Sequence, residues 1–279
     1  MKTVVITGAS SGFGYLTALK CAEKGFRVIA TMRNMEKASV FQSDRITREV
    51  RERIEVWQLD VTKSFSIQEF NARIQQLDRL DVLVNNAGFA LGGFVEQVPI
   101  DDYRRQFETN FFGLVQVTQA VLPVMRRQKS GKIINVSSVS GLIGFPGLSA
   151  YVSSKHALEG FSESLRFEVK PFGIDVALVE PGSYQTNIWS TGMEVPDQIH
   201  DPDSPYSEYT KGLWKALNRE SHGDPSHVAS LMTKLASKDR VKKLRYPIGA
   251  GVRVNLLLKR ILPWSWLEKS VLKKLLESY

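Results

Sequence analysis

Short apolar segments alternate with helix-like segments along most of this chain of 279 residues. Apolar runs that are bounded by turn residues and separated by helical patterns are typical of a parallel sheet covered by helices on both faces. The repeated strand–helix unit therefore predicts a doubly wound α/β fold. Seven parallel strands are expected, at Lys2–Thr7, Phe26–Thr31, Arg53–Leu59, Asp81–Asn85, Lys132–Ser137, Ile174–Glu180 and Leu244–Ile248.

The alternation stops after Pro181-Gly182. The stretch 190–207 contains three prolines among aspartates and serines, and aromatic residues flank it on both sides. Long insertions in compact domains are usually functional lids or disordered segments, and large aromatic side chains favour a packed lid. We therefore predict a single domain over residues 1–279, in which residues 183–226 form a substrate lid and residues 250–279 a C-terminal helical segment.

The net charge of +8 is distributed unevenly. Lys238–Tyr279 holds eleven Lys/Arg and three Asp/Glu, so the rest of the chain is balanced at 26 of each. A neutral body with a basic tail is not the pattern of a nucleic-acid-binding domain. The single Cys21 and four dispersed histidines predict neither a disulfide nor a metal site. No run approaches the apolar length of a membrane span, and the sequence predicts a cytoplasmic protein.

A glycine-rich turn joins the first strand to the first helix, with the sequence Thr7-Gly8-Ala9-Ser10-Ser11-Gly12-Phe13-Gly14. Its glycine spacing differs from the commoner G-x-G-x-x-G dinucleotide pattern, but the physical principle is the same. Glycine lets the backbone approach a pyrophosphate, and the N-terminus of the following helix stabilises the negative charge. Taken alone, such a turn could also be merely a tight connection.

The end of the second strand indicates which cofactor the loop would bind. Sites for NAD place an acidic side chain there to hold the ribose hydroxyls, whereas NADP sites use arginine to meet the additional phosphate. Here the strand ends Ala30-Thr31-Met32-Arg33, without a carboxylate. Arg33 can donate paired, charge-assisted hydrogen bonds to a phosphate, and Ser10 could add a hydroxyl. The sequence therefore favours NADP(H), unless Arg33 simply extends into solvent.

Tyr151 and Lys155 are four residues apart in a predicted helix, Ser149–Val169, and so lie on one helix face. A free tyrosine has a pKa of about 10, too high for a base near neutrality. A neighbouring ammonium favours the phenolate, so we expect Lys155 to lower the pKa of Tyr151 into the range of a general acid/base. Considered alone, the two residues could equally be a solvent-facing pair.

Three further segments support a catalytic interpretation. Asn85-Asn86-Ala87-Gly88 follows the fourth strand, and Ser137-Ser138 ends the fifth strand. Both lie at the carboxyl edge of the sheet, where open α/β folds bind their ligands. Asn110 is a polar residue within an otherwise apolar run of a helix predicted from Asp101 to about Arg127.

Together these motifs resemble those of the short-chain dehydrogenase/reductase family, in its single-domain Rossmann-type form. The resemblance extends from Lys2 to about Thr186, and within the family Ala30–Arg33 and His156–Phe161 are similar to the NADP-dependent hydroxysteroid and retinol dehydrogenase branch. It implies an NADP(H)-dependent oxidoreductase that interconverts a ketone or aldehyde and an alcohol on a lipophilic substrate. It further implies a homo-oligomer, either a dimer or a tetramer.

The resemblance also implies a role for each catalytic residue. Tyr151 would be the acid/base, and Lys155 would hold the nicotinamide ribose and depress the pKa of Tyr151. Ser138, thirteen residues before the tyrosine, would hydrogen-bond the reacting oxygen. Asn110 would position a water molecule in the proton relay.

Most of the predicted cofactor contacts come from the strand ends and the loops that follow them, and two come from the helix Ser149–Val169. They are Thr7, Gly8, Ser10, Ser11, Gly12, Phe13, Gly14, Arg33, Asp60, Val61, Asn86, Ala87, Gly88, Tyr151, Lys155, Pro181, Gly182 and Thr186. By the resemblance, Asp60 would meet the adenine, Asn86 the adenosine side and Thr186 the nicotinamide carboxamide. The predicted substrate pocket contains Ser138, Phe145, Tyr184 and Trp189. Tyr184 stands where the family often has a small aliphatic residue.

Two alternatives belong to other functional classes. A catalytically idle protein that binds NADP(H) as a sensor would not need Ser138, Tyr151 and Lys155 together. A nucleotide-dependent methyltransferase would not place a Tyr/Lys pair on the helix after the fifth strand.

The end of the chain allows two interpretations. Pro263 is expected to break the C-terminal helical segment. Beyond it, an apolar stripe faces a basic side of the helix. The stripe consists of Trp264, Leu267, Val271, Leu272 and Leu275, with Lys269, Ser270 and Lys273 opposite. The stripe could pack on the domain or on a partner subunit, or the basic tail could make a weak peripheral contact with an anionic membrane.

Overall fold

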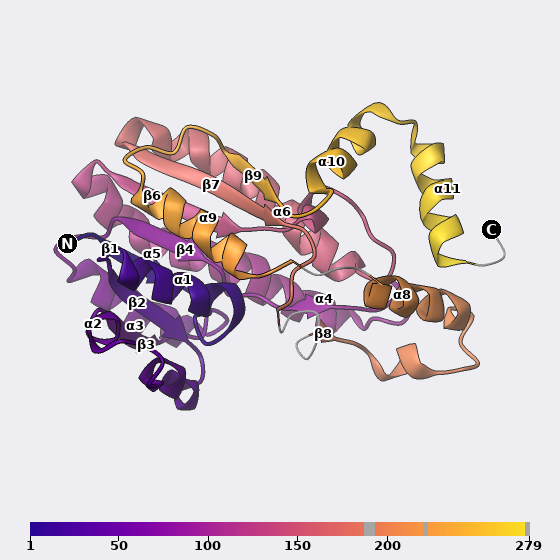
Figure 1. Cartoon of the computed structure of the whole chain (residues 1–279), viewed down its shortest axis with the longest axis horizontal. Coiled ribbons are helices and arrows are strands. Elements are labelled where there is room, and N and C mark those ends of the chain that lie inside the picture. Colours follow the sequence, from indigo (N-terminus) through magenta and orange to yellow (C-terminus); the bar gives the residue numbers. More distant parts are fainter. Residues whose placement is uncertain (187–192, 220–222, 277–279) are drawn as a thin grey trace.

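The computed structural model describes residues 1–186, 193–219 and 223–276. Its centre is a parallel sheet of seven strands in the order β3-β2-β1-β4-β6-β7-β9 (Figure 1), which confirms the predicted doubly wound fold. The strands are β1 (Thr3–Ile6), β2 (Arg27–Met32), β3 (Ile54–Gln58), β4 (Val82–Asn85), β6 (Gly131–Val136), β7 (Ile174–Pro181) and β9 (Arg245–Ile248). Each overlaps a strand predicted from the sequence.

Helices cover both faces of the sheet because successive side chains of a strand point to opposite sides. Val4 and Ile6 pack in the core beneath α1 and α9, whereas Val5 faces α3, α5 and α6 (Figure 1). The α-helices are α1 (Gly12–Glu23), α2 (Arg48–Glu52), α3 (Ser64–Gln75), α4 (Ile100–Phe107), α5 (Gly113–Gln128), α6 (Ser149–Val169), α8 (Ser207–Arg219), α9 (Ser226–Ser237), α10 (Val252–Ile261) and α11 (Trp264–Leu275).

The strand order reverses between β1 and β4, which are neighbours in the sheet. From β1 the chain runs outward through β2 to β3, and from β4 it runs outward through β6 and β7 to β9. Connections leave in opposite directions at this point, so a crevice opens outside the carboxyl ends of the two strands. The residues that follow β1 and β4 are therefore the ones placed to bind a ligand.

The helix predicted from Asp101 to about Arg127 is interrupted, which corrects the expectation of a continuous helix. α4 ends at Phe107, a π-helical turn (η2, Glu108–Phe112) follows, and α5 begins at Gly113. Gly113 packs so closely on the chain after β3 that a Cβ there would lie 2.7 Å from the Val61 carbonyl oxygen. Such turns often occur at functional sites, and Asn110 lies at the centre of this one.

The described parts of the predicted lid pack on the chain that follows β4. The strand β8 (Met193–Glu194) pairs with β5 (Ala90–Leu91) in a two-stranded sheet that was not predicted. The rings of Tyr206 and Tyr209 enclose Phe94, with centroids 4.6 Å and 5.5 Å away. These contacts bury Phe94 and partly bury Tyr206 and Tyr209, two of the aromatic residues that suggested a packed segment.

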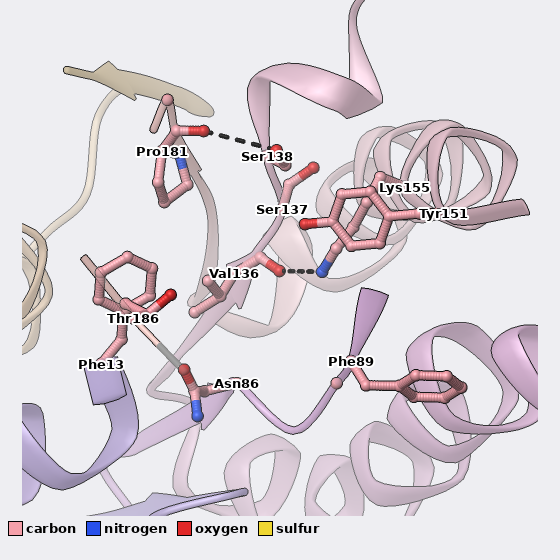
Figure 2. Close-up of a pocket in the computed structure, with 12 residues that line it drawn as sticks. Phe13, Asn86, Phe89, Val136, Ser137, Ser138, Tyr151, Lys155, Pro181 and Thr186 are labelled. Carbon is pink, nitrogen blue, oxygen red and sulfur yellow. Dashed lines mark hydrogen bonds between the residues drawn. The ribbon is translucent and has the colours of Figure 1, made fainter. Parts of the chain in front are cut away.

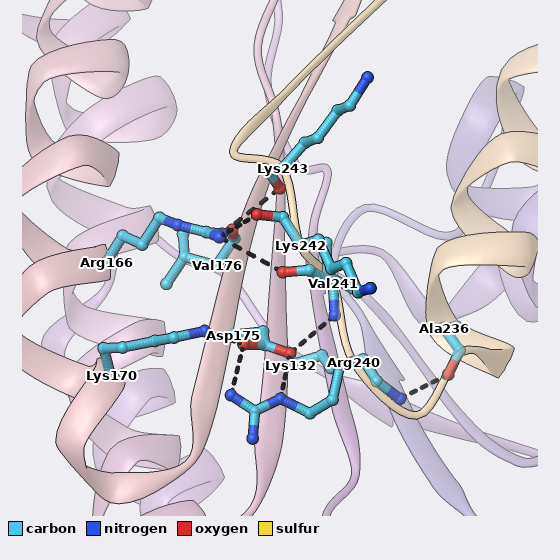
Figure 3. A network of polar contacts seen from close by, with 10 residues as sticks. All are labelled: Lys132, Arg166, Lys170, Asp175, Val176, Ala236, Arg240, Val241, Lys242 and Lys243. Carbon is cyan, nitrogen blue, oxygen red and sulfur yellow. Dashed lines mark hydrogen bonds and ion pairs between the residues drawn. The ribbon is translucent and has the colours of Figure 1, made fainter.

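The first part of the basic tail is anchored to β7 (Figure 3). Asp175 is 1% exposed and accepts hydrogen bonds from Lys170 Nζ at 2.9 Å, Arg240 Nε at 3.0 Å and the Val241 N–H at 2.7 Å. Burial acts to raise the pKa of Asp175, but these donors together outweigh it and lower the pKa. Arg166 adds hydrogen bonds to backbone carbonyls, including that of Val241 at 3.3 Å. Part of the positive charge of the tail therefore stabilises the fold.

Arg245, the first residue of β9, forms a second cluster of buried charge. It donates to Glu159, to Glu180 Oε1 at 2.9 Å and to Glu163 Oε1 at 2.6 Å. Glu159 is 4% exposed and Glu180 is fully buried. Burial raises the pKa of Glu180 to about 7 and lowers the pKa of Arg245. The Arg245 guanidinium thus donates hydrogen bonds to three carboxyl groups.

Two helices, α10 and α11, follow the sheet and are separated at Pro263, as the sequence predicted. Within the described ranges, no helix combines the length and the apolar character that crossing a bilayer would require.

Candidate active site

The glycine-rich loop leads from β1 into the N-terminus of α1. Gly8 and Gly12 have φ values of +65° and +54°, which favour glycine. A Cβ on Gly14 would lie 2.4 Å from the Gly8 carbonyl oxygen, so the third glycine lets the helix pack onto the loop. Ser11 makes no side-chain cap, and the first turn contains no acidic residue. The N–H groups of this helix end, with their partial positive charge, therefore fit a pyrophosphate.

The loop is joined to the chain after β4 by side-chain hydrogen bonds. Thr7 Oγ1 accepts from the N–H groups of Asn86 at 2.9 Å and Ala87 at 3.0 Å. In return, Asn86 Nδ2 donates to the carbonyls of Thr7 at 2.9 Å and Gly8 at 3.0 Å. The amide nitrogen of Asn86, expected on the adenosine side of the cofactor, thus holds the shape of the loop across the crevice.

Arg33 and Asp60, predicted to contact the adenosine end, follow β2 and β3. Arg33 follows β2 and is exposed, whereas Met32 is 2% exposed and packs in the core. Asp60 Oδ1 accepts from the Thr62 N–H at 2.9 Å and from the Thr62 hydroxyl at 2.7 Å, which fixes the turn after β3. Arg33 is therefore the side chain at this strand end that is accessible to a phosphate.

Ser138, Tyr151 and Lys155 converge on one side of a pocket at the carboxyl edge of the sheet (Figure 2). Their exposed fractions are 5%, 4% and 7%. The Ser138 hydroxyl is hydrogen-bonded to the Tyr151 phenol and lies 3.5 Å from the Pro181 carbonyl. Lys155 Nζ donates to the Val136 carbonyl at 2.8 Å. The structure thus joins Ser138, rather than Ser137, to the tyrosine.

The acid–base properties of these groups differ from the expectation. Burial raises the pKa of Tyr151 to about 12, although the hydrogen bond with Ser138 acts to lower it. The Lys155 ammonium is 5.7 Å from the centre of the tyrosine ring and donates to a backbone carbonyl. Burial lowers the pKa of Lys155 to about 8. The predicted lowering of the Tyr151 pKa is therefore wrong for this structure, because desolvation of the phenolate dominates.

Asn110 acts on the wall of the pocket through the chain after β4. Its Oδ1 accepts from the Phe89 N–H at 3.1 Å, and its Nδ2 donates to the Phe89 carbonyl at 3.0 Å and to Ser154 Oγ at 3.2 Å. The wider π-helical turn brings this buried amide to face the strand end. In this structure the Asn110 amide positions Phe89. Its role in holding a water molecule stays a prediction.

The pocket encloses about 470 Å³, including its open mouth. Its lining consists of Phe13, Asn86, Gly88, Phe89, Val136, Ser137, Ser138, Tyr151, Lys155, Pro181, Gly182 and Thr186. The sequence did not assign Phe89, Val136 or Ser137 to the site. In the sequence, these three residues are marked only by a position at or after the end of β4 or β6, which many structural residues share.

Of the predicted substrate-pocket residues that the structure describes, Ser138 lines this pocket, whereas Phe145 and Tyr184 do not. Tyr184 is 3% exposed and packs in the core, where its ring meets Phe13 edge-on with centroids 5.7 Å apart. The expectation that Tyr184 shapes the substrate pocket is therefore corrected, since its bulk fills the space behind the glycine loop. Phe145 is 38% exposed on the loop before α6. Trp189 lies outside the described residues.

A dinucleotide fits the arrangement of these residues. The helix N-terminus lies at one end, and the pocket with Ser138 and Tyr151 at the other. Thr186 lies between them, because a Cβ on Gly12 would be 3.8 Å from that of Thr186, which also lines the pocket. Ser137 Oγ is buried in the pocket wall without a hydrogen-bond partner among the described residues. A polar ring with an amide substituent could supply that partner.

Comparisons with known proteins give the same assignment. Residues 2–194 match the family model of the short chain dehydrogenases. An uncharacterized oxidoreductase of Bacillus subtilis, YusZ, is 51% identical over 276 residues, which cover 98% of each chain. Retinol dehydrogenase 8 of Bos taurus is 35% identical over 250 residues, 86% of this chain and 79% of the relative.

Among solved structures, ElxO with NADP bound superimposes with a TM-score of 0.75 and 29% sequence identity. The similarity covers 91% of this chain and 99% of ElxO. The fold, the glycine loop and the buried Ser/Tyr/Lys group therefore indicate the same family as the sequence similarity does. This chain belongs to the short-chain dehydrogenase/reductase family and is an oxidoreductase.

Proposed function

We propose that this oxidoreductase uses NADPH to reduce the carbonyl group of a lipophilic ketone or aldehyde to an alcohol. The observation that carries the proposal is the convergence of Ser138, Tyr151 and Lys155 in one pocket next to a glycine loop that fits a dinucleotide. A protein that only bound the nucleotide would not need a buried phenol hydrogen-bonded to a serine beside a buried ammonium.

Each polar side chain of this group would have its own role in carbonyl reduction. When bound, NADPH would supply the hydride to the carbonyl carbon. The Ser138 hydroxyl would hydrogen-bond the carbonyl oxygen, and the Tyr151 phenol would donate the proton that completes the alcohol. The Lys155 ammonium would stabilise the phenolate that remains until solvent returns the proton.

Two features agree with the proposed direction and substrate class. Tyr151, whose pKa burial raises to about 12, is protonated at neutral pH and can act as the acid in reduction. Phe13, Phe89, Val136 and Pro181 give the pocket an apolar lining that suits a lipophilic compound. Retinol dehydrogenase 8 is a relative whose name specifies a lipophilic alcohol.

Turnover with NADPH and NADH over a panel of ketones and aldehydes tests the proposal. We expect kcat/KM with NADPH to exceed that with NADH by about ten- to a hundredfold, the range expected for charge-assisted hydrogen bonds to the additional phosphate. The Arg33→Ala variant should lose this preference, because Arg33 is the accessible cation at the end of β2. As a matched control, Arg126→Ala removes an exposed charge from the end of α5 and should keep the preference.

Two results would contradict this proposal. Equal kcat/KM values for the two cofactors in the unmutated protein would remove the assignment of NADP(H). Tight NADPH binding without turnover of any carbonyl compound would favour a sensor instead of an enzyme.

The pH profile provides a separate test of the site. We expect kcat/KM for NADPH to fall by about tenfold per pH unit above about pH 8, where Lys155 loses its proton. The neutral amine no longer attracts the anionic cofactor or stabilises the phenolate. In Lys155→Arg the charge persists at high pH, so this break should disappear even if the rate is lower. A profile that is flat up to pH 10 in the unmutated protein would contradict the assignment.

A further inference from the structure

Helix α10, the first of the two helices that follow β9, has an apolar face that is exposed. Val254, Leu257, Leu258 and Ile261 are 59%, 57%, 37% and 62% exposed. Their spacing of three, four and seven residues places them on one side of a helix. Val252, on the other side, is buried. This is the reverse of an ordinary surface helix, which turns its apolar side toward the core.

Two exposed tryptophans lie at the start of α11, where they point to different sides of the helix because they are two residues apart. Trp264 and Trp266, directly after Pro263, are each 66% exposed. Leu275, at the other end of α11, is 8% exposed. The stripe predicted from the sequence is therefore divided, since its last leucine packs inward while Trp264 stays exposed. Tryptophan is the residue most typical of the boundary between a bilayer and water.

Basic side chains accompany the exposed apolar residues. Residues 251–279 contain six Lys/Arg and two Glu. Arg253 and Arg260 are exposed on α10, and Lys269 and Lys273 are exposed on α11. A second copy of this face would carry the same positive border, which does not favour self-association. An apolar face with a basic border matches an anionic lipid surface.

α10 leaves the domain after β9, and α11 runs back toward α8 (Figure 1). Lys259 Nζ donates to the carbonyl of Leu142, which ends the short turn that begins after Ser138. At the other end, α11 packs so closely on α8 that a Cβ on Gly212 would overlap the Leu275 carbonyl oxygen. The segment therefore connects the loop after the catalytic serine with a helix of the lid.

We propose that Val254, Leu257, Leu258 and Ile261 of α10, bordered by Arg253 and Arg260 and followed by the exposed Trp264, form a docking surface for the anionic face of a lipid bilayer. The protein binds there peripherally, with the apolar side chains among the headgroups and the arginines against lipid phosphates. The position beside the lid would let a lipophilic compound pass from the bilayer to the pocket. This last consequence rests on the proposed function, whereas lipid binding does not.

Co-sedimentation of the full-length protein with vesicles tests the proposal. We expect binding at low salt to vesicles of phosphatidylcholine mixed with phosphatidylserine, weaker binding at high salt, and little binding to phosphatidylcholine alone. The variant Arg253→Gln/Arg260→Gln should bind about thirtyfold more weakly, as follows from about 1 kcal/mol for each basic residue. Leu257→Ser/Ile261→Ser should also lose binding. Phe65→Ser, which alters an equally exposed apolar residue of α3, should keep it.

The test separates the alternatives. If the unmutated protein ignores anionic vesicles, or if none of the α10 variants changes its binding, the proposal is wrong. If Leu257→Ser/Ile261→Ser instead reduces the oligomeric mass in solution while vesicles are ignored, the face joins two copies. Because sedimentation needs no turnover, a failure of the proposed reaction would leave this result unaffected.

Discussion

The Tyr151→Phe variant should lose almost all carbonyl reduction while binding NADPH nearly as well as the unmutated protein. The substitution removes only the phenolic hydroxyl, which is the proton donor beside Ser138. Positioned general acids contribute about a hundred- to ten-thousandfold to a rate, so kcat should fall by that factor. Steady-state turnover and NADPH fluorescence titration measure the two quantities separately.

Two variants support the interpretation of this result. Lys155→Ala should weaken both turnover and NADPH binding, since the ammonium is expected to hold the cofactor as well as to stabilise the phenolate. Tyr15→Phe serves as a control, because Tyr15 packs on Phe41 away from the pocket and its ring remains. Substantial activity of Tyr151→Phe at any pH would show that the proton comes from another group.

The largest loss of stability is expected for Arg245→Ala. This change leaves Glu159 and Glu180 buried without their cation, and removing one partner of a buried ion pair costs about 3–5 kcal/mol. Arg27→Ala is the matched control, since Arg27 also lies on a strand and pairs with Glu55, whose side chain is 43% exposed. Its loss should be about 1 kcal/mol or less. Urea unfolding followed by circular dichroism measures both.

The pH dependence of this loss has a definite sign. Burial raises the pKa of Glu180 from 4.5 to about 7, so in this range the folded protein binds more protons than the unfolded chain. The contribution of Glu180 to stability is therefore full below about pH 4.5 and is lost as the pH rises through 7. Without Arg245 the penalty grows, so Arg245→Ala should be less destabilised at pH 5 than at pH 8. Adding Glu180→Gln should recover part of the stability at pH 8, and a loss that is independent of pH would contradict this account.

The sequence alone was sufficient for the sheet and for the convergence of Ser138, Tyr151 and Lys155. Short, nearly continuous apolar runs such as Ile174–Glu180 are local signals, and parallel strands necessarily bring their carboxyl ends to one edge. The residues after β1, β4 and β6 therefore had to meet, whatever the details of packing. The four-residue spacing of Tyr151 and Lys155 is likewise set by the helix itself.

What the tertiary structure decided depends on neighbours that are distant in the sequence. Desolvation by the surrounding chain raises the pKa of Tyr151, although the adjacent lysine predicted the opposite. Contacts with Phe13 place Tyr184 in the core. The hydrogen bonds between Asn110 and Phe89 depend on a π-helical turn, which the periodicity of the sequence did not predict. The sequence also did not predict that the apolar face of α10 is turned outward. A periodic stripe shows that one side of a helix is apolar, but it does not show which way that side faces. Burial and orientation are properties of the assembled fold, and only the assembled fold could fix them.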